Sequence, residues 1–153
     1  MKRVHFLVIT VFLSACAALR APTPTSTPTT VIPLILLVEE NPYRPQLEDT
    51  SLSIAGIELT SINLLERFDL DPFRVQLRLS GSLPSVCNEL RIEVAPPNEN
   101  FQVVMEVYSL ANPNIRCEHV LQQFEASILL GVYSTGRYTV WVNEGLVGDF
   151  IMY

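Results

Sequence analysis

The chain has 153 residues, 48% of them hydrophobic, and its 16 acidic and 10 basic residues give a formal net charge of −6. This length fits one domain, and the hydrophobic fraction excludes a protein that is disordered throughout. The acidic charge argues against nucleic acid as a partner, because that binding requires Lys and Arg side chains that neutralise phosphates.

The N-terminus has the pattern of an exported protein. Lys2 and Arg3 form a short basic region, and the apolar run at residues 4–13 is too short to cross a bilayer. We therefore interpret residues 1–15 as a secretory signal peptide. Residues 13–16 read Leu-Ser-Ala-Cys, so two small residues separate the end of the apolar run from Cys16.

Residues 13–16 resemble the lipobox of bacterial lipoproteins. The resemblance implies that Cys16 receives a diacylglycerol, that the peptide is cleaved before it, and that the new amino group is acylated, with palmitate a typical chain. Two or three acyl chains anchor a protein far better than one. We therefore expect a lipid-anchored protein on the bacterial cell membrane or outer membrane, facing the periplasm or the cell exterior. An ordinary signal peptide with a chance cysteine is the alternative.

A spacer follows at residues 16–33. Its centre, residues 22–30, consists of proline, threonine and one serine, and offers no side chains for a hydrophobic core. Proline fixes φ, so we expect an extended, polyproline-like tether that could also carry O-linked sugars. Because both bases before Cys16 leave with the signal peptide, eight arginines would remain against 16 acids, and the anchor would have to be the acyl chains.

Residues 34–50 form a docking segment of uncertain placement. The apolar run at residues 31–38 is followed by Glu39, Glu40 and a proline-rich stretch. An exposed run of this kind invites aggregation, so we expect it to dock as an extra edge strand, with Pro33 excluding it from a sheet interior. A tail that embeds near the lipid surface is the alternative.

Residues 51–153 alternate between apolar and polar side chains, the period of half-buried strands. In the first strand the apolar residues have odd numbers before Thr60 and Ser61 and even numbers for the next residues, which predicts a β-bulge there. The loop at residues 143–145 predicts a three-residue hairpin with Gly145 in the left-handed region. Residues 110–123 allow at most a turn or two of helix. Clear alternation occurs at residues 73–79, 90–94, 101–107, 124–130 and 138–142.

Strands with one apolar face each require two sheets packed face to face. We therefore expect an all-β fold, an immunoglobulin-like two-sheet antiparallel sandwich of about seven strands. Tyr138 matches the tyrosine corner of such domains, in which the phenol hydroxyl bonds backbone a few residues upstream. Val140 stands where antibody domains have a cysteine, so the expected similarity is one of architecture.

The domain also resembles a set of uncharacterised bacterial secreted lipoproteins over residues 56–153. The resemblance rests on Gly-Ser-Leu-Pro at residues 81–84 leading to Cys87, Asn-Pro-Asn at residues 112–114 before Cys117, and residues 124–125 and 136–143. It implies the same fold and location, and no activity is established for that set.

Cys87 and Cys117 form an even pair in an exported chain, so we expect a disulfide. Closing a loop of about 30 residues would stabilise the domain by roughly 3–4 kcal/mol. The alternative is a metal or thiol-base cluster of Cys87, Cys117, Glu118 and His119, which lacks a recognisable zinc spacing.

No motif in the sequence predicts catalysis. Asp69 and Asp71 could form an acid pair or a calcium site, but a solvated turn before Pro72 fits them better. The sequence has no Gly-x-Ser-x-Gly elbow and no phosphate-binding glycine loop. We therefore expect no catalytic residues, no metal and no cofactor.

Three outward-facing side chains suggest a partner surface. By strand parity Trp141, Tyr108 and Leu129 point away from the core, and aromatic residues are enriched at recognition sites. The alternative is that the N-terminal run or a loop covers them.

The sequence thus predicts a lipid-anchored, non-catalytic binding or assembly module of the bacterial envelope with a protein or envelope partner. A protease inhibitor that uses the loop at residues 96–100, and a small metal-dependent enzyme that uses Cys117 and His119, are the alternatives.

Overall fold

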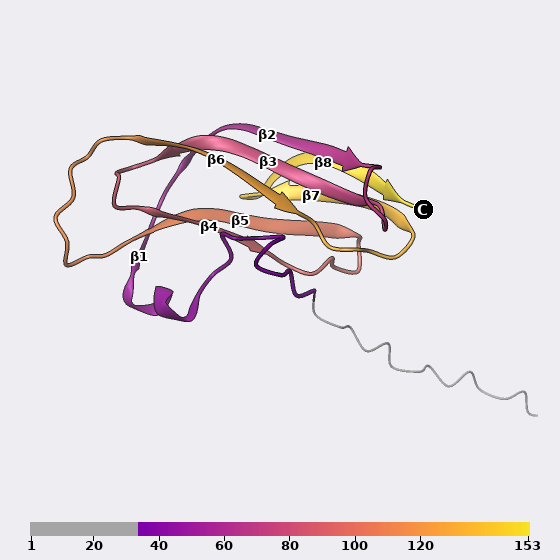
Figure 1. Ribbon diagram of the computed structural model, residues 1–153, viewed down its shortest axis with the longest axis horizontal. Helices are drawn as coiled ribbons and strands as arrows, with labels where there is room; N and C mark the ends of the chain where they lie inside the picture. Colours follow the sequence, from indigo (N-terminus) through magenta and orange to yellow (C-terminus); the bar gives the residue numbers. More distant parts are fainter. Residues whose placement is uncertain (1–33) are drawn as a thin grey trace, which may run out of the picture. The chain divides into compact units, whose positions relative to one another are not determined.

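The structure is a computed structural model that describes residues 34–153. The predictions for the signal peptide at residues 1–15, for the spacer at residues 16–33 and for Cys16 lie outside these residues. The described part contains one short 3-10 helix and otherwise only strands and loops (Figure 1). These elements are η1 (Leu47–Ser51), β1 (Ser53–Ala55), β2 (Glu58–Arg67), β3 (Arg74–Leu83), β4 (Glu89–Val94), β5 (Gln102–Ala111), β6 (Gln122–Leu129), β7 (Gly136–Val142) and β8 (Gly145–Met152).

The strands form two sheets, which confirms the predicted all-β sandwich. One sheet has the order β2-β3-β6, and the other has the order β1-β5-β7-β8 with β4 on the opposite side of β5. Figure 1 shows β2, β3 and β6 above β4 and β5.

One strand pair departs from the expected antiparallel pattern. β5 and β7 run parallel, with Val104 opposite Trp141, whereas every other pair in the two sheets is antiparallel. The expected sandwich is antiparallel throughout, so this pair is a departure from it. No hairpin joins β5 to β7, because the chain between them crosses to the other sheet as β6, so the pair is free to run parallel.

The core consists of the inward residues of both sheets. The alternating residues of β3, including Val75, Leu77 and Leu79, are buried, as the pattern of apolar residues predicts. Ile92 of β4 and Met105 of β5 are fully buried from the opposite sheet. The bulge predicted near Thr60 is also present, because the register of β2 against β3 shifts between Leu59 and Ser61.

The turn between β7 and β8 differs from the prediction. It is a two-residue turn in which Asn143 and Glu144 both have positive φ, 46° and 67°, whereas Gly145 is the first residue of β8 and has no positive φ. Positive φ at both central residues is the geometry of a type I′ hairpin, which asparagine tolerates well. Farther back, residues 112–121 form a loop without a helix.

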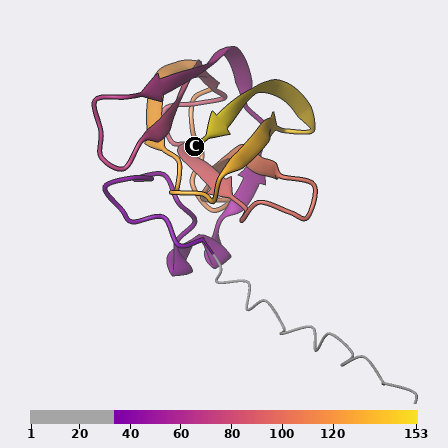
Figure 2. The same cartoon turned by 90° about the vertical axis from the view of Figure 1, so that its right-hand side faces the viewer.

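Residues 34–51 form an irregular segment that we call the strap. It does not form the predicted edge strand. Instead it bonds the free edges of both sheets, because Leu129 of β6 donates its backbone N–H to Glu40 (2.8 Å) and Ile92 of β4 donates to Tyr43 (2.8 Å). Prolines at positions 42 and 45 lack the N–H groups of a regular ladder. Figure 2 shows the indigo and purple strap along one side of the sandwich.

Buried and charged contacts hold the strap in place. Leu36 is 7% exposed, and the buried Asn41 donates its side-chain amide to the carbonyl oxygen of Ile92 (2.8 Å). Glu40 forms an ion pair with Arg74 (2.8 Å), and Asp49 of η1 forms a two-point ion pair with Arg91 (2.7 and 2.8 Å). Strap contacts of this kind protect sheet edges from pairing with other chains.

Candidate functional site

A groove of about 660 Å³ lies on the outer face of the five-stranded sheet. It brings together residues of β1, β4, β5 and β7 and of the turn between β7 and β8. Volumes between about 300 and 1,000 Å³ are usual for ligand-binding clefts. Its lining consists of Ile54, Glu93, Gln102, Val104, Met105, Glu106, Val107, Tyr108, Trp141, Asn143 and Glu144.

Strand register places the two aromatic residues of the groove on the same face of the sheet. Tyr108 and Val104 share the outer face of β5, and Val104 is the direct partner of Trp141 across β5 and β7. Both aromatic side chains are half-buried. The indole Nε1 of Trp141 donates to the hydroxyl of Thr139 (3.1 Å), so its polar atom is already bonded within the protein.

Asn143 completes the groove at a gap in the sheet. β7 pairs with β5 only as far as Met105, and β1 pairs with β5 only from Ser109 onward. Between them the side chain of Asn143 replaces a strand, because it accepts from the N–H of Val107 (2.7 Å) and donates to its carbonyl oxygen (2.9 Å). The backbone at this point is therefore satisfied although no strand lies beside it.

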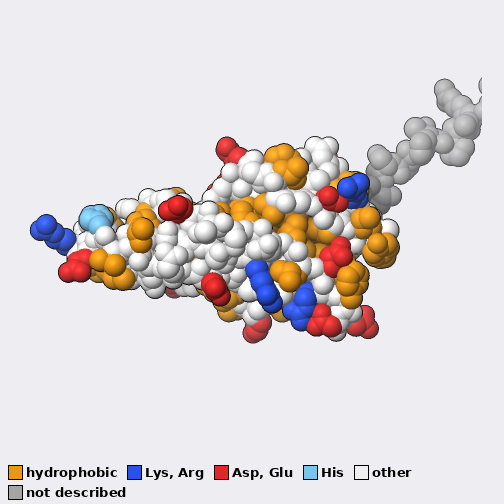
Figure 3. Space-filling model, turned by 90° about the horizontal axis from the view of Figure 1, so that it is seen from above, with side chains coloured by type: hydrophobic (Ala, Val, Ile, Leu, Met, Phe, Trp, Pro, Cys, Tyr) orange, Lys and Arg blue, Asp and Glu red, His pale blue; other side chains and the backbone are white. Residues whose placement is uncertain are grey.

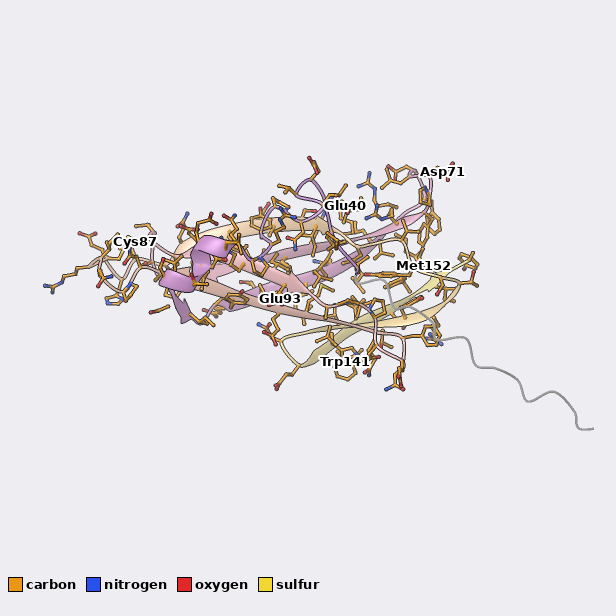
Figure 4. All side chains as sticks on the ribbon, turned by 90° about the horizontal axis from the view of Figure 1, so that it is seen from below. Glu40, Asp71, Cys87, Glu93, Trp141 and Met152 are labelled. Carbon is orange, nitrogen blue, oxygen red and sulfur yellow. A yellow bond between two sulfur atoms is a disulfide. The ribbon has the colours of Figure 1, made fainter. Side chains whose placement is uncertain are left out.

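The rim of the groove is acidic. Glu93 and Glu106 are direct partners across β4 and β5, and Glu144 lies in the turn beyond Trp141. All three side chains are exposed, and none forms an ion pair within residues 34–153. Figure 4 shows Glu93 and Trp141 on neighbouring parts of the sheet, far from Cys87.

The acidic surroundings also affect Tyr108. Burial raises the pKa of its phenol above the ordinary value, and the nearby charges of Glu93 and Asp49 raise it further, while Arg91 opposes them. Burial is the larger of these causes, and the neighbouring carboxylates add to it.

Leu129 does not belong to this groove. It is at the end of β6 in the three-stranded sheet, where it is half-buried and its backbone N–H bonds Glu40 of the strap. Strand parity showed that its side chain faces outward but could not show to which sheet it belongs. Sequence reasoning missed Ile54, which lies on the three-residue β1, and the acidic rim, because exposed glutamates are common on any strand.

The opposite end of the sandwich carries the disulfide. Cys87 and Cys117 are bonded, with their Cα atoms 6.2 Å apart, and tie the loop after β3 to the loop after β5. Exposed Val86, Ile115 and Leu121 lie in the same two loops. Figure 3 shows hydrophobic, basic and histidine side chains on this projecting end.

The disulfide bears on the metal-site alternative. Both thiols of the suggested cluster are in the bond, so neither is available as a thiolate ligand. His119 is exposed in the loop after β5. Within residues 34–153, no group of three or more His, Cys, Asp and Glu side chains is placed to hold a metal ion.

The remaining candidates have structural roles in turns. Asp69 accepts two bonds from Arg67 (2.7 and 2.8 Å), which lower the pKa of its carboxyl group. The loop at residues 96–100 is ordered by Asn98, whose side-chain oxygen accepts from the backbone N–H of Asn100 (3.0 Å) and Gln102 (3.1 Å).

Tyr138 makes the bond expected of a tyrosine corner. Its hydroxyl donates to the carbonyl oxygen of Ser134, four residues upstream, at 2.9 Å. The ring is 2% exposed and packs against Tyr133, Phe150 and Phe101, with ring centroids between 5.1 and 5.4 Å apart. The bond and the ring contacts fix the loop that leads into β7.

Comparison with known proteins agrees with the fold. None of the helices in the described residues is long and apolar enough to span a membrane. No curated protein and no solved structure matches the chain. Residues 77–152, from β3 to β8, match the model of a family described as the ORF11 beta-sandwich domain.

Proposed function

We propose that the protein is a lipid-anchored, non-catalytic binding or assembly module of the bacterial envelope, with the groove as its binding surface. The observation that carries the binding role is the pair of half-buried aromatic side chains, Tyr108 and Trp141, in one open groove. The lipobox-like residues 13–16 support the anchor, and the disulfide fits an oxidising compartment outside the cytoplasm.

Packing supports a binding role over a simple structural one. The strap, which could have covered the aromatic residues, lies on the edges of β4 and β6 instead, and no strap residue lines the groove. Large aromatic side chains held by strands present apolar area with little loss of rotamer freedom on binding. An uncovered pair of this kind is typical of an interaction surface.

The lining of the groove supports a non-catalytic role. It holds no serine, cysteine or histidine, so a nucleophile–base pair of the Ser–His or Cys–His kind is absent from it. Its polar side-chain groups are three glutamates, two amides, a phenol and an indole N–H, and the amide of Asn143 is already bonded to the β5 backbone.

The anchor is tested by labelling the protein in its native host with an alkyne fatty acid. The wild-type chain should carry the label, and the Cys16→Ser variant should lose it. Labelling that persists in the Cys16→Ser variant would contradict lipidation at this residue.

The binding surface is tested by site-specific photo-crosslinking in the same cells. A benzoyl-phenylalanine at position 104, in the floor of the groove, should give a defined adduct, whereas the same residue at position 63, exposed on β2, should not. Adducts of equal yield from both positions, or none from position 104, would contradict the assignment of the groove.

A further inference from the structure

The groove contains a pair of glutamates whose positions do not stabilise the fold. Glu93 and Glu106 stand directly opposite each other on the outer face of β4 and β5. Like charges in this position destabilise a sheet. The nearest base along β4, Arg91, is fully engaged, because it binds Asp49 at 2.7 Å and Glu89 at 2.8 Å. The pair therefore has no neutralising partner within residues 34–153.

Elsewhere on the described surface, arginines do meet acids. Arg137 pairs with Asp149 (2.9 Å) and Arg67 pairs with Asp69 (2.7 Å), both in exposed positions. The groove is set apart by its lining, which combines three carboxylates with two aromatic rings and contains no Lys, Arg or His. A positive group that enters the groove would remove this repulsion and gain attraction from each carboxylate.

The aromatic rings favour the same kind of ligand. Cations are attracted to the faces of tryptophan and tyrosine, and a guanidinium can stack on a ring while it donates to carboxylates. Beside the rings, Ile54 is 76% exposed and Val104 is 38% exposed, and both are suited to apolar neighbours of the cation. The groove thus combines an acidic rim with an apolar floor.

We propose that the groove binds a cationic polypeptide segment, one that presents arginine or lysine between apolar side chains. This inference rests on the proposed binding function and names the chemistry of its partner. An acidic peptide or an anionic lipid headgroup would be repelled by the rim. A neutral glycan could stack on the rings and donate its hydroxyls to the carboxylates, but it would leave the repulsion among the three negative charges in place.

The test uses an internal reporter. Trp141 is the only tryptophan of the chain, so intrinsic fluorescence reports on the groove. The full chain, purified from membranes in a neutral detergent, is titrated with the peptide acetyl-Gly-Leu-Arg-Ser-Arg-Leu-Gly-amide and with counterparts that carry Gln or Glu in place of Arg. We expect a saturable change with the arginine peptide, binding about tenfold tighter than that of the glutamine peptide, and weakening with salt.

Paired variants separate the groove from the general charge of the protein. The double variant Glu93→Gln/Glu106→Gln should weaken binding of the arginine peptide about tenfold. The control is Glu66→Gln/Glu125→Gln, which removes the same charge from exposed positions on β2 and β6. It should leave binding of the arginine peptide unchanged.

Three results would overturn the proposal. One is equal binding of the arginine and glutamine peptides, and another is an equal effect of the two double variants. The third is a response of Trp141 to a neutral oligosaccharide such as chitohexaose but to no peptide, which would assign the groove to a glycan. If no peptide binds while position 104 still gives an adduct in cells, the cationic partner is refuted and the binding function stands.

Discussion

Asp49 is expected to be the most sensitive charged residue of the strap. Its two carboxylate oxygens accept from Arg91 at 2.7 and 2.8 Å, and one of them also accepts from the backbone N–H of Gln46 (2.8 Å) at the start of η1. Only 13% of its side chain and 8% of that of Arg91 are exposed. The Asp49→Asn variant keeps the shape and one acceptor but removes the charge.

The expected loss is about 2 kcal/mol of unfolding free energy at neutral pH. Breaking a buried ion pair by removing one partner commonly destabilises by about 3–5 kcal/mol, because the other charge is left uncompensated. Here the loss is smaller, because Arg91 keeps Glu89 at 2.8 Å and the carbonyl oxygen of Leu90 at 3.0 Å. The asparagine oxygen also retains one hydrogen bond.

Urea unfolding followed by Trp141 fluorescence measures this loss, and Asp69→Asn is the matched control. Asp69 has the same two-point contact with Arg67, but 62% of its side chain is exposed. Solvent screens such pairs, so the control should change the unfolding midpoint far less. Equal shifts for the two variants would refute the argument that burial makes the Asp49 pair important.

The same pair predicts a pH dependence. Hydrogen bonds from Arg91 hold the pKa of Asp49 below its ordinary value of 3.8, with burial opposing and the N–H of Gln46 assisting. A lowered folded-state pKa stabilises the protein above the unfolded-state value, and this stabilisation is lost as the pH falls through the folded-state value. The difference between wild type and Asp49→Asn should therefore be constant above about pH 5 and should shrink below pH 4. A constant difference down to pH 2 would contradict this.

Three further predictions concern the sandwich itself. Tyr138→Phe removes the bond to Ser134 and should lower the unfolding free energy by about 1 kcal/mol in thermal or urea unfolding, whereas unchanged stability would show that the corner contributes little. Gly81→Ala should destabilise by about 3 kcal/mol, because its Cβ would overlap the carbonyl oxygen of Glu58, whereas Gly56→Ala has open space and should be nearly neutral in the same assay. Reduction of the disulfide, whose cysteines are 30 residues apart, should lower the urea midpoint by the equivalent of about 3–4 kcal/mol, and an unchanged midpoint would contradict its role.

The sequence pattern predicted correctly which side chains of a strand face the core and where local motifs form, because each of these follows from a single physical rule. Alternation along β3, β4 and β5 set which side chains face the core, and the parity change near Thr60 located the bulge. The bond of Tyr138 follows from a local motif in which the hydroxyl reaches backbone only four residues away. These features depend on contacts between residues close together in the sequence, or on the two-residue period of a strand, and both can be read from the sequence.

Features that depend on which strands become neighbours could not be read from the sequence. Parity placed Trp141, Tyr108 and Leu129 outside the core, but only the sheet order separates Leu129 from the groove. The parallel pair of β5 and β7, and the meeting of Glu93 with Glu106, follow from the same order. The hairpin turn was mispredicted because Gly145 suggested positive φ, whereas Asn143 and Glu144 adopt it.

The strap also determines how the domain responds to force. A pull on the chain ahead of residue 34 loads the strap first, and its bonds to Leu129 and Ile92 lie at successive points along it. A pull that peels the strap away from the sheets would break these two bonds one after the other. The 18 residues of the strap span at most about 60 Å when fully extended, so its release would lengthen the connection by less than that with the sandwich still folded. The strap is therefore the part of the described domain that a pull from its N-terminal side reaches first.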